Sequence, residues 1–139
     1  MFLEDLDYRT MIQDEDLEIV EQSDETVRQR AELTAIEQMR GYLRSRYDVA
    51  RIFPDLIPDP DSRNQVIVMI AMDITLYHLH ASVPTRLVPE IRVKRYDDAI
   101  SWLEKVQMGK VNPGLPLIGA ADPGAPIRFG SQERCDNSW

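Results

Sequence analysis

Apolar residues along this chain recur mostly at intervals of three and four, the spacing that places them on one side of an α-helix. The strongest such segment is 64–83, where apolar residues occupy almost the whole circumference of the predicted helix, as in a helix enclosed by a bundle. A capping box of Ser62 and Gln65 predicts its start, and Pro84 predicts its end. Its most apolar side is expected to comprise Met69, Met72, Leu76, Leu79 and Val83, and its only water-facing side Thr75, His78 and Ser82.

The same spacing predicts four further helices, at residues 2–12, 14–22, 23–47 and 89–108. Ser23 is placed to cap the long helix, and Pro89 is placed as the first residue of the last one. Gly41 lies inside the long helix at a cost of about 1 kcal/mol relative to alanine, so we expect another helix to cross closely there. The pattern predicts an all-α fold: a small helical bundle of short N-terminal helices and three longer helices.

The composition changes after residue 108. Residues 109–139 hold five of the six glycines and four of the nine prolines, so a helix cannot continue through them. We therefore divide the chain into a helical domain, 1–108, and an extended Pro/Gly-rich C-terminal arm, 109–139. The arm either wraps its own domain or docks on another subunit or protein, and its spaced anchors favour docking. The expected partner-binding residues are Leu115, Leu117, Ile127, Arg128, Phe129, Arg134 and Trp139.

Charge is distributed unevenly along the 139 residues, which is a length typical of one domain. Residues 1–25 hold ten acids and one base, a net charge of −9, whereas the remaining fourteen acids and fifteen bases sum to +1. An acidic chain does not bind phosphate backbones strongly, which argues against a sequence-reading DNA binder. Acids follow Met1 closely, unlike a secretory signal, and the single Cys135 excludes an internal disulfide and fits a reducing compartment.

Candidate chemistry is confined to the segment 64–83. Asp73, Tyr77 and His80 lie on one stripe of the predicted helix and are expected to form a polar group within the core. A buried carboxylate needs a partner, for which Arg40, Arg44 or Arg95 is available. These polar residues argue against a membrane span, although the segment is almost long enough for one.

Such a group suits a structural role better than a catalytic site with perturbed pKa values, which remains an alternative. His78 and His80 are two positions apart on the predicted helix and point in different directions, so they cannot hold one metal. No cofactor and no metal are expected.

Several segments resemble a Mu-like phage family usually described as a domain of unknown function. The resemblance is carried by FLEDLDYRTMI, IEQMRGYLRSRYDV, AMDITLYHLHASVP and IRVKRYDDAISWLEKVQMGKVNPGLPL, and by the ending RFGSQERCDNSW. Together they span nearly the whole chain, from Phe2 to Trp139. The genes of that family lie between the head genes and the tail genes.

The resemblance implies a virion structural protein and not an enzyme. The family is similar in layout to the head–tail connector, or adaptor, proteins that complete phage heads. Those proteins form a ring of about a dozen copies under the portal. The implied partners are other copies of the chain, the portal protein and a downstream neck or tail protein, while genomic DNA passes without specific binding. The implied location is the virion neck, after synthesis in the bacterial cytoplasm. The alternatives are a stopper or tail terminator and, in a different class, a small enzyme using Asp73 and His80.

Overall fold

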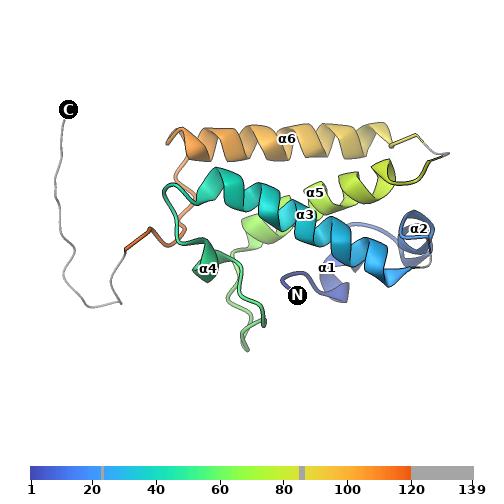
Figure 1. Cartoon of the computed structure of the whole chain (residues 1–139), viewed down its shortest axis with the longest axis horizontal. Helices are drawn as coiled ribbons and strands as arrows, with labels where there is room; N and C mark the ends of the chain where they lie inside the picture. The colour runs from blue at the N-terminus through green and yellow to red at the C-terminus, as the bar shows by residue number, and fades with distance from the viewer. Residues whose placement is uncertain (23, 85–86, 120–139) are drawn as a thin grey trace.

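The computed structural model describes residues 1–22, 24–84 and 87–119, and these residues confirm the predicted all-α class. Three long helices make the body, and shorter helices lie against one side of it (Figure 1). Within the described ranges the only β pairing is an isolated antiparallel bridge between Tyr47 and Leu117. The helices are α1 (Asp5–Arg9), α2 (Asp14–Val20), α3 (Glu25–Leu43), α4 (Val49–Ile52), α5 (Gln65–Ala81) and α6 (Glu90–Gln107).

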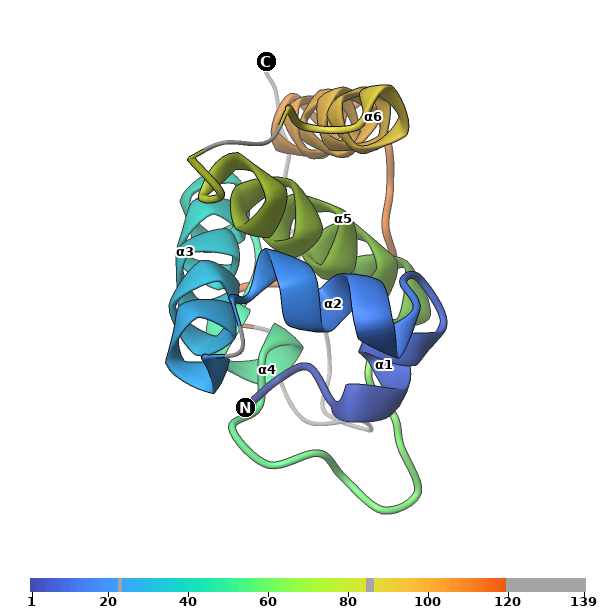
Figure 2. The same ribbon diagram turned by 90° about the vertical axis from the view of Figure 1, so that its right-hand side faces the viewer.

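Helix α5 is the centre of the fold. It packs against α3 and α6, and α1 and α2 lie across its remaining side (Figure 2). Asn64 caps its start, because the Asn64 side-chain oxygen accepts hydrogen bonds from the backbone of Val66 at 3.0 Å and Ile67 at 3.1 Å. The predicted cap at Ser62 was therefore wrong by two residues. The cap satisfies two of the amide groups that a helix leaves unpaired at its N-terminus.

The orientation of α5 differs from the sequence prediction. Thr75 was expected to face water, yet it is fully buried, and its hydroxyl is unpartnered within the described residues. Met69 was expected in the core, yet Met69 and Val66 are 42% and 45% exposed. Because apolar residues surround this helix, the covering elements decide which sector is buried. The Met69 sector lies along a groove between α5 and α6.

The long helix α3 is shorter than predicted at its C-terminal end. Asp24 caps its start by accepting a hydrogen bond from the Thr26 amide at 2.9 Å. The helix ends at Leu43, and the chain then turns into the short α4, which the sequence pattern did not predict. A Cβ at Gly41 would meet no atom within 4 Å, so the predicted close helix crossing is absent.

The last helix, α6, agrees with its predicted bounds to within two residues. Pro89 stands just before the first helical residue, and Gly109 follows the helix with φ of +80°, a conformation that glycine adopts without strain. Beyond Gly109 the chain folds back on its own domain. The Asp48 amide donates to the Pro116 carbonyl at 2.8 Å, and the Ile118 amide donates to the Arg46 carbonyl at 3.1 Å.

Candidate functional site

Asp73 is held by Arg95, one of the three arginines that the sequence suggested. The guanidinium donates from Nε to one carboxylate oxygen at 2.7 Å and from Nη2 to the other at 3.2 Å. The Asp73 side chain is 5% exposed and that of Arg95 is 35% exposed, so the pair lies at the edge of the α5–α6 contact. Burial raises the pKa of Asp73, and the hydrogen bonds from Arg95 oppose that rise.

Tyr77 and His80 do not join Asp73 in a hydrogen-bonded line. Tyr77 stacks on Tyr96 of α6 with ring centroids 4.0 Å apart, whereas His80 Nδ1 shares a hydrogen bond with the Leu76 carbonyl one turn earlier, at 2.8 Å. In the described part of the chain no hydrogen bond connects any two of Asp73, Tyr77 and His80. The expected single polar group is therefore three separate contacts, two of which tie α5 to α6.

A polar chain that the sequence did not reveal crosses the interface of the three long helices. His78 Nε2 and the Gln38 carbonyl oxygen are 3.0 Å apart, and the Gln38 amide nitrogen donates to the Tyr96 hydroxyl at 2.9 Å. Because the Gln38 oxygen can only accept, His78 Nε2 carries the proton of this bond. Burial lowers the pKa of His78, so the neutral ring is favoured.

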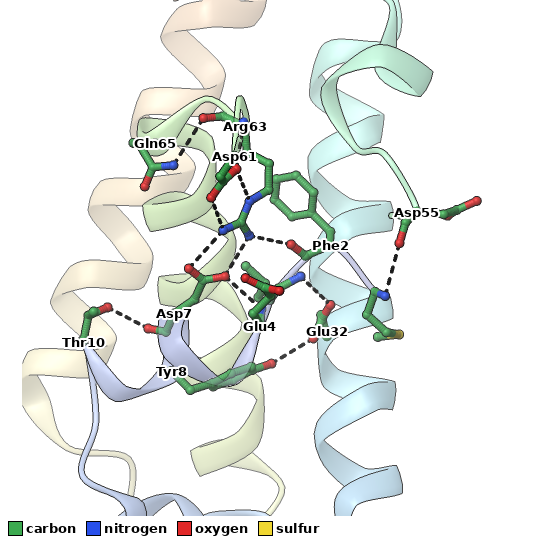
Figure 3. Close-up of polar contacts among 12 residues, drawn as sticks. Phe2, Glu4, Asp7, Tyr8, Thr10, Glu32, Asp55, Asp61, Arg63 and Gln65 are labelled. Carbon is green, nitrogen blue, oxygen red and sulfur yellow. Dashed lines mark hydrogen bonds and ion pairs between the residues drawn. The ribbon is translucent and has the colours of Figure 1, made fainter. Parts of the chain in front are cut away.

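The most extensive polar cluster centres on Arg63, just before α5, and we call it the Arg63 clasp (Figure 3). Its Nε donates to Asp61 at 2.9 Å, Nη1 donates to the Phe2 carbonyl and to Asp7, each at 2.7 Å, and Nη2 donates to Asp61 at 2.8 Å and to Asp7 at 3.3 Å. All five N–H groups of the guanidinium are thereby used. The side chain is 3% exposed, and the neighbouring carboxylates raise the pKa of Arg63, so it stays charged.

Glu32 of α3 holds the other side of the N-terminal segment (Figure 3). One carboxylate oxygen accepts from the Leu3 amide at 3.1 Å, and the other accepts from the Tyr8 hydroxyl at 3.0 Å. Burial raises the pKa values of both Glu32 and Tyr8, while the two hydrogen bonds act to lower that of Glu32. Together with the Arg63 clasp, this contact fastens residues 2–8 between α3 and the start of α5.

The predicted anchors of the arm divide into two sets. Leu115 is 8% exposed and packs in the hydrophobic core of its own domain, so the structure corrects its expected role as a partner-binding residue. Leu117 is paired with Tyr47 through its backbone, and its side chain is 52% exposed. The remaining anchors lie outside the described residues: Ile127, Arg128, Phe129, Arg134 and Trp139.

The described residues show neither a metal centre nor a helix that could span a membrane. Across residues 1–22, 24–84 and 87–119, no group of three or more His, Cys, Asp or Glu side chains is arranged to hold a metal ion. No helix in these ranges is long and apolar enough to cross a membrane. The buried charges described above are instead used in contacts between helices and between the N-terminal segment and the bundle.

Comparison with known families gave one match. The family described as Bacteriophage Mu, Gp36 matches residues 3–126, which include the six helices found among the described residues and the segment that folds back after α6. Comparisons with curated proteins and with solved structures gave no match.

Proposed function

Because the chain belongs to the Bacteriophage Mu Gp36 family, we propose that it is a structural protein of the phage particle that joins the head to the tail. As a head–tail connector, or adaptor, it forms a ring that docks on the portal protein and receives the next neck or tail protein. The genome passes through this ring without specific binding. The family match over residues 3–126 carries the proposal, since it covers all but the first two residues of the helical domain.

The use of the buried polar groups supports a structural role. All five N–H groups of the Arg63 guanidinium donate to the N-terminal segment or to its own loop, and Asp73 is paired with Arg95. An enzyme that uses Asp73 and His80 would need these side chains to act on one bound molecule. Instead His80 Nδ1 faces the Leu76 carbonyl and the Asp73 carboxylate faces Arg95. We therefore propose that the protein is not an enzyme.

The acidic N-terminal region supports a non-binding passage for DNA. Most of the acids of α1 and α2 are exposed, and residues 1–25 sum to −9. Repeated around a ring, those of these acids that face the channel and not a neighbouring copy repel the phosphate backbone. A ring whose residues 1–25 lie on its outer surface would remove this role while leaving the connector role intact.

The location is tested with a tagged protein in phage particles. An epitope inserted at Leu56, which is 84% exposed in the loop before α5, should leave the helical domain folded. Labelled virions should then show the tag at the head–tail junction by electron microscopy. Label on the capsid or along the tail, or absence of the protein from purified virions, would refute the proposal.

Binding to purified portal protein distinguishes an adaptor from a stopper or tail terminator. An adaptor should bind the portal without any other neck protein, whereas the other two need an intermediate layer.

The role of the arm is tested by ending the chain after Gly119. Residues 109–119 pack on their own domain, so a stop after Gly119 preserves Leu115 and the contacts of Asp48 and Ile118, which a stop after Met108 would remove. The shortened chain should unfold cooperatively, yet fail to bind the portal and yield heads without tails. Infectious particles assembled with the shortened chain would contradict the predicted role of the arm in binding the portal.

A further inference from the structure

Opposite charges gather at the two ends of the helical domain. Helices α3 and α6 run in the same direction, with α2 at the end of the domain where they begin and α4 at the end where α3 finishes (Figure 1). Residues 14–25 at the first end, here the acidic end, hold seven acids and no base. Residues 40–51 and 105–110 at the second end, here the basic end, hold six bases and one acid.

Helix dipoles account for only part of this arrangement. A dipole favours acids in the first turn of a helix and bases in the last turn. This covers the acids Asp14, Glu15, Asp16 and Glu25 and the bases Arg40, Arg51 and Lys105. Glu18 of α2 lies beyond the first turn of its helix and Lys110 lies beyond the last turn of α6, whereas Arg51 lies in the last turn of α4. Arg51 and Lys110 are both exposed. Within the described residues neither of them forms an ion pair, so these bases are available to an external partner.

The acidic end also carries an apolar groove. It has a volume of about 560 Å³ and is lined by residues of α2, the end of α5 and the start of α6. Its rim holds three large apolar side chains that remain exposed: Ile19 at 45%, Leu87 at 95% and Ile91 at 57%. Asp16 and Arg92 line the same groove, and Arg92 donates from Nη2 to the Met11 carbonyl at 2.7 Å. A surface that combines exposed apolar residues with charge is typical of a protein-binding site.

The basic end carries exposed apolar residues, here called the apolar projection. Met108, Leu117 and Ile118 are exposed by 60%, 52% and 56%. The backbone bond from Ile118 to Arg46, at 3.1 Å, and the bridge between Leu117 and Tyr47 hold this segment against the domain. The projection is thus fixed in place before binding, which lowers the entropy cost of an interface.

We propose that the acidic end of one copy binds the basic end of the next, with Leu117 and Ile118 entering the groove beside Ile19 and Ile91. Asp16 and Glu18 of the first copy then face Arg51 and Lys110 of the second. Such a head-to-tail contact repeats from copy to copy and closes into a ring when the rotation permits. A two-fold contact made end to end would place like charges together, so the charge pattern favours the head-to-tail arrangement at these ends. The inference specifies the self-interaction surface of the proposed ring and rests on that proposal.

Paired charge reversals test the contact in the full-length chain. The first variant is Asp16→Lys with Glu18→Lys, and the second is Arg51→Glu with Lys110→Glu; all four side chains are exposed. Asp55→Lys with Asp97→Lys, also exposed and outside both surfaces, is the control that matches the first variant in charge change. Self-association is measured by sedimentation velocity at low ionic strength over a range of concentrations.

The wild-type chain and the control should self-associate, and each reversed variant should associate about 100-fold more weakly because like charges now meet. An equimolar mixture of the two variants should regain association. The first variant is then basic at both ends and the second is acidic at both ends, so opposite charges meet only between the two variants. A monomeric wild-type chain, unchanged association of either variant, or failure of the mixture would overturn the inference. If the chain is monomeric in solution but its tag is found at the virion neck, the proposed contact between copies is overturned and the connector function is not. A self-associating chain absent from virions would overturn only the connector function.

Discussion

Replacing Arg63 is the most direct test of how this domain is held together. Its guanidinium joins the loop before α5, through Asp61, to the N-terminal segment, through Asp7 and the Phe2 carbonyl. That segment contributes Phe2, at 5% exposure, and Tyr8, at 1% exposure, to the core. An Arg63→Ala chain therefore loses five hydrogen bonds and leaves a carboxylate and a carbonyl near the core without their donor.

The expected loss is about 3 kcal/mol in the free energy of unfolding. Removing one partner of a fully buried ion pair costs about 3–5 kcal/mol. The Asp61 side chain is 38% exposed and can be hydrated again, and that of Asp7 is 12% exposed, so the value belongs at the lower end of this range. Small domains are stable by about 5–15 kcal/mol, so the loss is a large fraction of the total. It corresponds to a fall in melting temperature of about 10 °C.

Urea unfolding followed by circular dichroism measures this loss. Arg63→Lys should also destabilise the protein, because an ammonium has three donors where the clasp uses five. Arg44→Lys is the matched control, since the Arg44 side chain is 60% exposed and its pair with Glu37 is worth less than about 1 kcal/mol. A loss below about 1 kcal/mol for Arg63→Ala would show that apolar packing alone holds the N-terminal segment, and would refute the reasoning.

Two further predictions concern α5. Asp73→Ala should lower the free energy of unfolding by about 1–3 kcal/mol, because it leaves the Arg95 guanidinium without its acceptor at the edge of the core. A melting temperature equal to that of the wild type would contradict the structural role of Asp73. Loss of a specific reaction at unchanged stability would support the enzyme alternative. His78 should make stability fall as the pH drops below its ordinary pKa of about 6.5, because burial lowers the folded-state pKa and the unfolded chain therefore takes up a proton that the folded chain refuses. His78→Gln keeps a donor for Gln38 and should lose this component, so equal pH dependence of urea unfolding for the two chains between pH 5 and 7.5 would exclude it.

The positions of the helices follow largely from the sequence. The three-and-four spacing predicts α5 and α6 to within two residues at each end, because burial of one helical stripe and the nearby cap and proline signals act over short distances. Pro89 and Gly109 are examples: one fixes φ before the helix, and the other adopts the positive φ that follows it. The need of Asp73 for a partner also follows from the sequence, since a carboxylate in an apolar helix must be compensated.

Contacts between distant segments depend on the tertiary structure. Helix α5 is apolar around almost its whole circumference, so its sequence does not show which side faces water. The packing of α3, α6 and the N-terminal segment decides that Thr75 is buried and Met69 exposed. Likewise, packing of α6 selects Arg95 as the partner of Asp73 from the three arginines that the sequence allows.

The Arg63 clasp and the path of the chain after α6 show the same limit. Arg63 stands in a turn-rich segment, and Asp7, its partner across the fold, is 56 positions away, so no local pattern signals the pair. Leu115 is one apolar residue among prolines and glycines, a composition equally compatible with an arm that leaves the domain. Its burial follows from the backbone hydrogen bonds that join Pro116 and Ile118 to Asp48 and Arg46, about 70 positions earlier in the chain. Local spacing thus determines where helices form, whereas the choice among distant partners is made only when the whole chain packs.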